Sequence, residues 1–559
     1  MSLRSVRPRV LVFGGGVGGL SVAHELLERG FRVTVLEKEH WGGKVRGIPV
    51  PGSGTDGRSD LPGHHGFHFF PCFYRNLPAT MARIPVGSDG KTVADHLVWG
   101  DFEMLARSME PTAKIPARFQ FTWKWLVESL RAVWVMQRGI PIEELAFFLV
   151  RALAFAGTCR KRRLNELDEV TWWDYVEASD MSEAYKHLVA NLSAAALIAV
   201  EPEVASTRTL GDAMIQMMES GFTPGQTIDR VLDGPEQETW VLPWVAHLRS
   251  LGGELIMPAS LRELEFDGRR ITGAVVEVDG ETRREVADHY VVALPVDVAR
   301  RFFSPDIRRA SPSLARIDEV EVGWMNGIQF FLRRELPVVR GHIGFDDTPW
   351  ELTAVGQAQF WNGFDWSRTG DGTCKEAFSV IISDWDTPGI VTGKPAKECT
   401  RDEIYAETLA QLNASLQKLG DGIAEADIVR WFLDPDIESR RGDPDRDDNQ
   451  EKLFVTTVGA WSARPGPATE IPNLFLASDW LRTYMDFASA EGTNEVSRRC
   501  ANAILDAAGS TARRVDVFRP KQPWLLAPLR AVDRLLWHIG FPALGYWGAT
   551  PLTPPPLAR

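Results

Sequence analysis

The chain has 559 residues, which is enough for two or three domains, and its 44% hydrophobic and 25% charged residues are typical of a soluble globular protein. The net charge of −13 argues against a nucleic-acid partner, because phosphate binding requires a basic surface. Five scattered cysteines without metal-ligand spacing predict no metal site, no disulfide framework and a reducing, cytoplasmic setting.

The first element is a βαβ unit. An apolar strand at 9–13 runs into a glycine turn, a helix and a second strand that ends at Glu37. Gly14 allows the tight turn, Gly16 lets the backbone approach a pyrophosphate, and Gly19 lets the helix pack closely on the strand. The helix N-terminus offers free N–H groups to the phosphates, and Glu37 can accept ribose hydroxyls. These features predict a dinucleotide without a 2′-phosphate and leave the choice between FAD and NAD open.

Two segments follow the acid. Residues 41–46 hold a second glycine pair with basic residues, which fits a flavin protein whose chain passes close to the extended cofactor, although a solvated turn would look the same. Residues 64–77 hold three histidines among phenylalanines. Because no acid or cysteine lies at useful spacing, packing against a large flat ligand is favoured over a metal. His68 also fits an ordinary buried histidine.

These segments carry a family resemblance. The series Gly42-Gly-Lys-Val45, followed by Gly66-Phe-His-Phe-Phe70 and Tyr74-Arg-Asn76, resembles the FAD-dependent carotene (phytoene) desaturases of the plant and cyanobacterial type. These belong to one flavoprotein superfamily with amine oxidases and hydroxysqualene dehydroxylases. The resemblance covers about residues 8–510. Where the family usually has an acid before its histidine motif, this chain has His64.

Residues 119–157 are rich in Trp, Phe, Leu and Val. Positions 123, 126, 130, 133 and 134 lie on one face of a predicted helix. With the flanking basic residues, this face suits a membrane interface and equally suits a core-facing helix. The resemblance favours docking, because this region is the lipid-entry part of the desaturases. The basic run 160–163 is either a solvated turn or a contact with anionic headgroups, and 192–200 is similar to the substrate-cavity helix of the family.

The chain then returns to the nucleotide-binding sheet. Strands with Asp-Gly hairpin turns are predicted at 260–266 and 271–278, and a buried strand at 290–295. The resemblance places Leu261 on the adenine side and the turn at Ala293 over the cofactor. Residues 300–460 predict a mixed sheet that roofs the substrate cavity, and the acidic run 443–448 predicts a solvated loop.

The C-terminal signature is a strand that delivers Asp479, a loop, and a helix predicted at 493–508. Asp479 can bind ribityl or pyrophosphate oxygens, and the helix N-terminus can face the flavin pyrimidine edge and favour the charge of reduced flavin. Ser478 and Thr493 replace the Gly and Ala of the family pattern, and both are small. The resulting predicted FAD contacts are Gly14, Gly16, Val17, Gly18, Gly19, Glu37, Lys38, Gly43, Lys44, Arg46, Gly66, His68, Leu261, Ala293, Asp479, Glu491, Gly492, Thr493 and Val496.

The end of the chain adds an amphipathic helix at 523–537, which packs on the body or touches a membrane, and a tail at 551–559 that is predicted to be disordered. The sequence shows no secretory signal and no apolar run long enough to span a bilayer. We therefore expect a cytoplasmic protein, with peripheral contact on the inner face of the membrane.

The expected fold is α/β: a Rossmann-like FAD-binding domain with an inserted mixed α+β substrate domain and a helical, lipid-facing subdomain. The expected segments are FAD-binding at 1–100, 241–300 and 461–510, helical at 101–240, mixed sheet at 301–460, and a C-terminal helix and tail at 511–559.

The expected activity is desaturation of a CH–CH bond in a long isoprenoid or carotenoid-like lipid, by hydride transfer to flavin N5. Quinone or oxygen is the expected electron acceptor. A homo-oligomer is one possible assembly of the chain. Arg46, His68 and Arg464 are the catalytic candidates, each with a structural or cofactor contact as its alternative. The lack of a Ser-His-Asp or zinc pattern fits this chemistry. A flavin amine oxidase and a non-redox polyene isomerase or lipid-presenting subunit are the alternatives.

Overall fold

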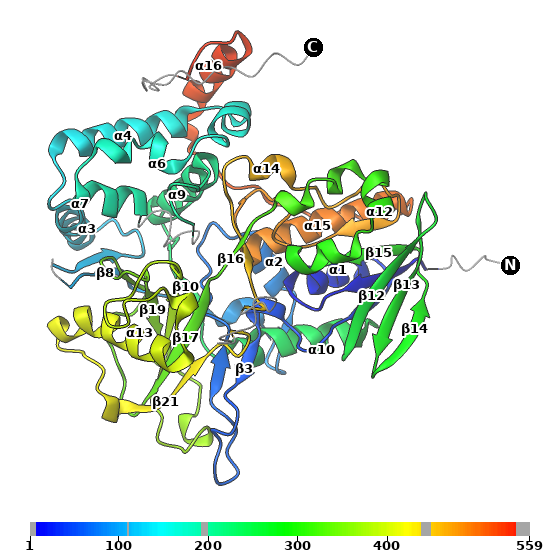
Figure 1. Ribbon diagram of the computed structural model, residues 1–559, viewed down its shortest axis with the longest axis horizontal. Helices are drawn as coiled ribbons and strands as arrows, with labels where there is room; N and C mark the ends of the chain where they lie inside the picture. The colour runs from blue at the N-terminus through cyan, green and yellow to red at the C-terminus, as the bar shows by residue number, and fades with distance from the viewer. Residues whose placement is uncertain (1–6, 109–110, 192–199, 438–448, 544–559) are drawn as a thin grey trace.

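The computed structural model describes residues 7–108, 111–191, 200–437 and 449–543. Three sequence predictions lie wholly or almost wholly outside these ranges: the substrate-cavity helix at 192–200, the acidic loop at 443–448 and the disordered tail at 551–559. Figure 1 shows three connected bodies, which are marked by α1 (Val17–Leu27) and α15 (Ala490–Ala507), by α13 (Arg401–Leu416), and by α4 (Ile142–Gly157) and α16 (Ala527–His538).

A five-stranded parallel sheet forms the first body. Its strands lie in the order β11 (Glu254–Ile256), β2 (Arg32–Leu36), β1 (Arg9–Phe13), β15 (His289–Val292) and β23 (Leu474–Leu476). Three distant parts of the chain thus meet in one sheet. Val10 and Val12 of β1 pack on the side of α1, α10 (Leu242–Ser250) and α15, whereas Leu11 and Phe13 face the opposite side, because successive side chains of a strand alternate between faces.

The opposite face is covered by a three-stranded antiparallel sheet, made of β12 (Ala259–Phe266), β13 (Ile271–Val278) and β14 (Glu281–Glu285). The predicted Asp-Gly turns join these strands. Gly268 and Gly280 have positive φ, as hairpin turns of this kind require.

A seven-stranded mixed sheet forms the second body, with α13 packed on it. Its order is β21 (Ile428–Leu433), β17 (Asn326–Leu332), β20 (Glu376–Ile382), β19 (Thr353–Gly356), β18 (Ile343–Phe345), β8 (Phe102–Ala106) and β9 (Ala113–Pro116). The expected helical segment at 101–240 includes residues 102–106 and 113–116, which are strands of this sheet. The structure differs because β8 pairs in parallel with β18, far along the chain, and local patterns do not reveal such a partner.

The third body is helical and contains α3 (Trp123–Met136), α4, α9 (Thr207–Phe222) and α16. Helix α3 buries Ala132 and Val135, whereas Trp123, Leu130 and Trp134 are 78%, 60% and 57% exposed. The predicted apolar face of this helix therefore points to solvent, and its core-facing alternative is wrong.

The basic run at 160–163 is only partly a solvated turn. Arg162 and Arg163 are buried. Arg162 pairs with Asp533 of α16 at 2.8 Å, and Arg163 pairs with Asp212 of α9 at 2.5 Å. For these two residues the prediction of a solvated turn or a headgroup contact is wrong, because their side chains form buried ion pairs with α16 and α9 instead.

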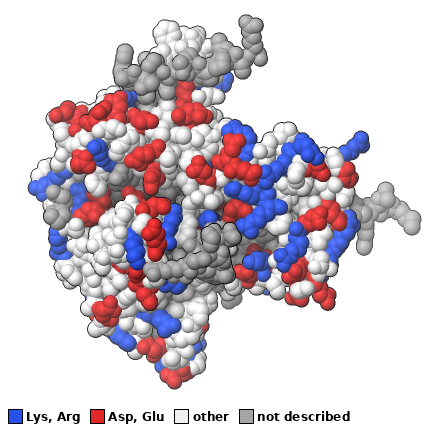
Figure 2. Space-filling model, viewed as in Figure 1, with Lys and Arg blue, Asp and Glu red and all other residues white. Residues whose placement is uncertain are grey.

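Shorter elements complete the described chain: β3 (Gly47–Pro49), β4 (Pro62–His64), β5 (Pro85–Val86), β6 (Lys91–Thr92), β7 (Leu97–Trp99), β10 (Arg230–Leu232), β16 (Val322–Gly323), β22 (Leu453–Phe454), α2 (Asn76–Met81), α5 (Arg160–Arg162), α6 (Trp172–Tyr175), α7 (Glu183–Tyr185), α11 (Val296–Ala299), α12 (Pro305–Ala310) and α14 (Ala460–Ala463). Each helix in the described ranges is too short or too polar to cross a bilayer. Acidic and basic side chains are interspersed over the face seen in Figure 2.

Candidate active site and cofactor site

Three glycines of the first motif are required by packing within the chain itself. Gly14 has φ +106°, and a Cβ built there would lie 2.4 Å from the Ala293 carbonyl oxygen. A Cβ at Gly18 would lie 2.1 Å from the carbonyl oxygen of Ala477, and one at Gly19 would lie 1.9 Å from that of Gly14. These positions hold β1, β15, β23 and α1 in contact.

Gly16 is different. Its φ of −77° is open to any residue, and the nearest protein atom to a built Cβ is Gly43 Cα at 3.6 Å, an ordinary contact. Gly16 is also the N-cap of α1, where no side chain caps the helix and no acid lies in the first turn. The N–H groups of this turn are left for an anion from outside the chain. The protein alone gives no reason for a glycine at this position, but an approaching phosphate does.

Glu37 closes the turn. Its carboxylate accepts the Gly15 N–H at 2.6 Å and the Glu39 N–H at 3.0 Å, while its own N–H donates to Ile256 on the neighbouring strand. The Gly42 N–H in turn donates to the Gly15 carbonyl at 2.9 Å. The acid and both glycine pairs are thereby fixed around the end of β2.

The remaining predicted contacts of the nucleotide domain gather at the same edge. Thr493 at the start of α15 lies beside Gly18, and Asp479 follows β23, with its Oδ1 accepting from the Ser478 hydroxyl at 3.2 Å. Leu261 and Val496 are buried in the same core cluster as Leu11 and Phe13 of β1. The carboxyl ends of parallel strands are where ligands of such sheets bind. Contact of these residues with FAD stays a prediction.

Three predicted contacts use their side chains elsewhere. Lys38 is exposed and pairs with Glu39, and Lys44 donates to the Lys452 carbonyl. Glu491 is buried, and its carboxylate accepts four hydrogen bonds of 2.8–2.9 Å from residues 75–77 at the start of α2. The prediction for Glu491 therefore rests on its backbone. Helix α15 also begins at Ala490, three residues before the predicted start, because Ser489 caps it.

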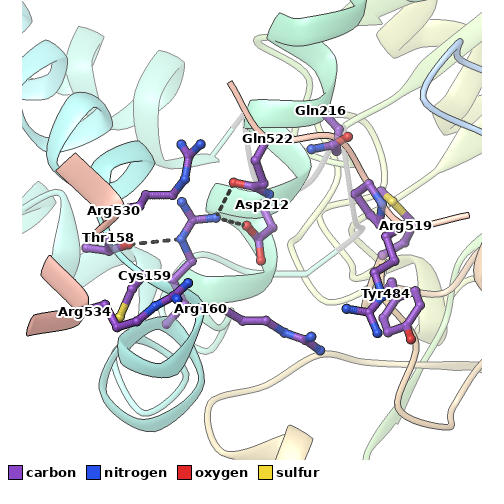
Figure 3. A pocket seen from close by; sticks show the side chains of 13 residues that line it. Thr158, Cys159, Arg160, Asp212, Gln216, Tyr484, Arg519, Gln522, Arg530 and Arg534 are labelled. Atoms are coloured by element: carbon purple, nitrogen blue, oxygen red, sulfur yellow. Dashed lines mark hydrogen bonds and ion pairs between the residues drawn. The ribbon is translucent and has the colours of Figure 1, made fainter. Parts of the chain in front are cut away.

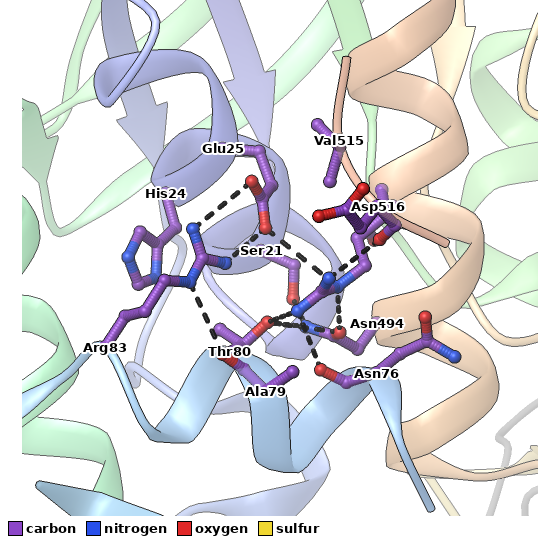
Figure 4. A network of polar contacts seen from close by, with 12 residues as sticks. Ser21, His24, Glu25, Asn76, Ala79, Thr80, Arg83, Asn494, Val515 and Asp516 are labelled. Atoms are coloured by element: carbon purple, nitrogen blue, oxygen red, sulfur yellow. Dashed lines mark hydrogen bonds and ion pairs between the residues drawn. The ribbon is translucent and has the colours of Figure 1, made fainter. Parts of the chain in front are cut away.

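Figure 4 shows how this helix is held. Arg498 of α15 donates to Asn494, to Thr80 and to the Asn76 carbonyl, and Asn494 donates to Ser21 of α1. Together with Glu491, these bonds fasten α15 to α1 and α2. The network fixes where the N-terminus of α15 points.

Replacing Glu491 by glutamine is expected to lower the free energy of unfolding by about 2 kcal/mol, because the charged acceptor of four N–H groups is lost and a donor then faces donors. Urea unfolding of the purified protein measures this change. Asp506→Asn on the same helix, which removes only an exposed pair with Arg514, is expected to change stability by less than about 0.5 kcal/mol. Equal stability of Glu491→Gln and the parent would contradict the capping role.

The three clustered histidines all have partners that come from distant parts of the chain. Buried His64 lies 3.0 Å from the Ser379 hydroxyl and 2.8 Å from Gln357, and burial lowers the pKa of His64 to about 4. His65 pairs with Asp434. The sequence offers no acid at useful spacing from these histidines, because the acid that pairs with His65 lies 369 residues away along the chain.

His68 reveals a functional candidate that sequence analysis missed. Its Nδ1 lies 3.7 Å from Oε1 of Glu236, a buried carboxylate. Burial acts to raise the pKa of Glu236, but His64 and His68 outweigh it, and the pKa lies below its usual value. Phe67, Val231, Val355, Phe360 and Trp361 line a small cavity with this pair. No spacing rule connects residue 236 to the histidine motif.

The two arginine candidates are buried in ion pairs. Arg46 pairs with Asp436 and with Glu451, the latter at 3.0 Å. Arg464 is fully buried and pairs with Asp486, and burial together with nearby Arg208 lowers the pKa of Arg464 to about 9. The structure does not bring Arg46, His68 and Arg464 into contact with one another. The assignment of Arg46 and Arg464 as catalytic stays a prediction, and their ion pairs favour the structural alternative.

Two groups of described residues place three metal-ligating side chains within 4.8 Å of one another, namely His24, Glu28 and His247, and Glu103, Asp229 and His342. In the first, His24 Nδ1 accepts from the Trp244 indole, so Nε2 carries the proton toward Glu28 and is in the wrong tautomer to bind a metal. In the second, burial and Asp229 raise the pKa of Glu103 well above its usual value. The absence of a metal stays a prediction.

Comparison with known proteins adds a family match. A profile described as flavin containing amine oxidoreductase matches residues 17–505. The chain is 24% identical over 519 residues to 15-cis-phytoene desaturase of Synechococcus elongatus, covering 90% of this chain and 98% of that protein. It is 24% identical over 516 residues to the chloroplastic/chromoplastic enzyme of Arabidopsis thaliana, with coverages of 90% and 81%.

Solved structures show the same fold. Putrescine oxidase bound to putrescine superposes with a TM-score of 0.59 at 14% identity, covering 90% of this chain and 99% of that one. Cyclohexylamine oxidase from Brevibacterium oxydans gives a TM-score of 0.57 at 13% identity, with coverages of 90% and 100%.

Proposed function

Because the chain belongs to the flavin containing amine oxidoreductase family, we propose that it desaturates a long apolar isoprenoid or carotenoid-like lipid. The prediction of an FAD-dependent oxidoreductase with a Rossmann-type flavoprotein fold is confirmed. Desaturation of this substrate class is the activity named for the relatives that match over nine-tenths of the chain.

The residues present fit FAD. The uncapped N-terminus of α1 and the unneeded glycine at position 16 suit the pyrophosphate, and Glu37 sits where a ribose would be held. When bound, FAD supplies the acceptor for a hydride from the substrate. The described residues then have to hold the substrate, exclude water and take up a proton.

One observation carries the proposal: a small cavity of about 10 Å³ beside the histidine motif is lined mainly by aromatic and aliphatic side chains, with the titratable side chains of His68 and Glu236 among them. At this size the cavity holds no more than about one water molecule, so an apolar substrate enters it only after the walls move apart, and it then meets few polar groups. The rings of Phe360 and Trp361 can stabilise positive charge on the substrate by cation–π contact. Glu236, whose pKa is lowered, stays ionised near neutral pH and can accept a proton from a substrate carbon.

Replacing Glu236 by glutamine is expected to lower turnover about tenfold, because a carbon acid next to developing positive charge loses its proton easily and needs only a weak base. Because flavin reduction reports only the hydride transfer that precedes proton loss, a single-turnover chemical quench that quantifies the desaturated product measures this step. Glu238→Gln, two residues along the chain at an exposed position outside the cavity lining, serves as the matched control. An unchanged rate in Glu236→Gln with full FAD content would remove Glu236 from the mechanism.

A flavin amine oxidase is the second candidate. The anionic Glu236 beside aromatic rings could pair with a substrate ammonium, and solved amine oxidases share the fold. Anaerobic stopped-flow mixing of the yellow protein with a panel of squalene- and carotene-type lipids in detergent, beside a panel of amines, separates the two. Bleaching of the flavin band by a lipid supports the desaturase. Bleaching by amines alone overturns it, and a rearranged polyene without bleaching indicates an isomerase. Reoxidation by quinone or by oxygen then identifies the acceptor.

We also propose peripheral contact with the cytoplasmic face of a membrane, supported by the exposed tryptophans of α3. Replacing Trp123, Leu130 and Trp134 together by glutamine is expected to weaken binding to neutral phosphatidylcholine vesicles at least about tenfold, because large apolar side chains no longer leave water. Cosedimentation measures the binding. Ile390→Gln with Val391→Gln, at exposed apolar positions of the second body, is expected to have no effect, and equal losses in both variants would contradict a docking face on α3.

A further inference from the structure

A pocket rich in arginine lies between the helical body and the C-terminal segment. Its volume is about 280 Å³, and its walls come from the turn after α4, from α9, from residues 484–485 and from residues 519–534 (Figure 3). Five arginines line it: Arg160, Arg163, Arg519, Arg530 and Arg534. A single carboxylate, that of Asp212, lines it with them.

That carboxylate is already used. Asp212 accepts from Arg163 at 2.5 Å, and the same guanidinium donates to Thr158 at 3.0 Å, to Gln522 at 3.1 Å and to the carbonyls of Phe155 and Ala156. Figure 3 marks the contacts of Thr158, Asp212 and Gln522 with this guanidinium as dashed lines. Arg163 is therefore a satisfied wall of the pocket and not its ligand-binding group.

The other four arginines have no carboxylate partner among the described residues. Arg530 donates only to the carbonyls of Ala156, at 3.3 Å, and Pro523, at 2.7 Å. Arg160 and Arg519 lie over the Tyr484 ring, with 5.7 and 4.8 Å from Cζ to the ring centroid. Burial and nearby Arg163 lower the pKa of Arg530, as expected where like charges gather without a counter-ion. The pocket thus holds several positive charges that nothing in the described chain neutralises.

The walls of the pocket are fixed in place. Asp533 of α16 accepts from Arg162 and from the Cys159 N–H, both at 2.8 Å and both buried. Leu529 of α16 lies against Gly157 at the end of α4, at 3.5 Å from a Cβ built there. Guanidinium groups held in fixed positions favour a phosphate group over a spread-out negative surface. The reason is that a planar guanidinium can donate two parallel hydrogen bonds to two oxygens of one phosphate.

Exposed apolar side chains lie on the two helices that meet at this pocket, α4 and α16. Leu149 and Leu153 of α4 and Leu529 and Leu535 of α16 are each about half or more exposed. Phosphate-binding groups next to apolar helix faces match an amphiphile with a phosphate head and hydrocarbon chains.

We propose that this arginine pocket binds a phosphate group, supplied by the headgroup of an anionic phospholipid at the membrane surface. The chemistry recognised is the phosphate oxyanion, which a soluble phosphate or diphosphate shares. The site is lined by the helical body, the loop at 484–485 and the C-terminal segment, and its residues are separate from the cavity of His68 and Glu236. It does not depend on the oxidation proposed above, and its test measures binding and not turnover.

The test uses the full-length holoprotein and three kinds of vesicle: phosphatidylcholine alone, phosphatidylcholine with phosphatidic acid, and phosphatidylcholine with oleate at the same surface charge. Isothermal titration with inorganic pyrophosphate measures the soluble source. Arg519→Gln/Arg530→Gln/Arg534→Gln is compared with a variant of equal charge loss, Arg262→Gln/Arg284→Gln/Arg309→Gln, whose exposed arginines lie on β12, β14 and α12. Arg519→Gln/Arg534→Gln, which keeps the backbone bonds of Arg530, guards against misfolding.

The parent is expected to prefer phosphatidic acid over oleate, and the triple pocket variant to lose on the order of 100-fold in that affinity, from roughly fivefold for each arginine. The control variant is expected to stay within about twofold. Saturable pyrophosphate binding without a preference among vesicles would support the pocket with a soluble phosphate as its source. Equal binding to phosphatidic acid and oleate with no pyrophosphate binding, or equal losses in pocket and control variants, would overturn the proposal. Loss of flavin reduction with intact vesicle binding would affect only the proposed desaturation.

Discussion

Gly16→Ala is expected to give a folded but colourless protein, with FAD affinity lowered on the order of 100-fold. The polypeptide itself tolerates the new methyl group, because φ at Gly16 is −77° and the nearest atom to a Cβ is 3.6 Å away. The methyl group would instead occupy the approach of the pyrophosphate to the N-terminus of α1. Weaker FAD binding also removes about 2.7 kcal/mol of ligand stabilisation at constant cofactor excess.

Three measurements test this expectation: the flavin absorbance of the purified variant, FAD titration of the apoprotein, and thermal unfolding of the apoprotein. The apoprotein of Gly16→Ala is expected to unfold like the parent apoprotein. Gly18→Ala is expected to lose both FAD binding and the stability of the apoprotein, since its Cβ would lie 2.1 Å from the Ala477 carbonyl oxygen. Gly344→Ala, where the nearest atom is 3.5 Å away and no ligand is predicted, is the matched control. A yellow Gly16→Ala protein with the affinity of the parent would move the pyrophosphate away from α1.

The contrast between Gly16 and Gly18 shows what a sequence motif can predict. The strand, turn, helix and acid of the first unit lie within 30 residues, and their order follows from local periodicity and from the conformations that glycine allows. The parallel nucleotide-binding sheet was therefore predictable from the residues, whereas FAD as the nucleotide followed only from the family resemblance. The motif does not distinguish a glycine that a ligand requires from one that a neighbouring strand requires, because β23 enters from residue 474 onward.

The polar groups of the candidate site were much less predictable. Asp434, the partner of His65, and Glu236, the partner of His68, come from 369 and 168 positions away along the chain, and no pattern within either segment indicates the pairing. The exposed face of α3 likewise shows that a local sequence pattern does not reveal which other elements lie nearby. The periodicity of this helix predicts an apolar face correctly, but whether that face meets solvent or the core depends on which other elements pack nearby.

Asp486→Asn is expected to lower the free energy of unfolding by about 3–5 kcal/mol. Asp486 is buried and pairs with both Arg208 and Arg464. Arg208 keeps a second carboxylate, Asp168, at 2.8 Å, whereas Asp486 is the carboxylate with which Arg464 pairs among the described residues. The substitution therefore leaves a fully buried guanidinium without its counter-charge. Backbone strain does not confuse the result, because φ at Asp486 is +62° and asparagine accepts this conformation well.

The loss should depend on pH with a definite sign. In the folded parent, burial and nearby Arg208 bring the pKa of Arg464 to about 9, below its ordinary value of 12.5. Between these two values the unfolded chain binds more protons than the folded chain, so stability rises with pH. Removing Asp486 lowers the pKa of Arg464 in the folded protein further. The pH range in which stability rises with pH therefore begins at a lower pH in the variant. The deficit of Asp486→Asn is therefore expected to be largest near pH 7 and to shrink toward pH 10, as urea unfolding at several pH values would reveal. Asp306→Asn, which removes only an exposed pair with Arg309, should show no such trend. A deficit of Asp486→Asn that stays constant between pH 7 and pH 10 would mean that Arg464 is not charged in the folded protein.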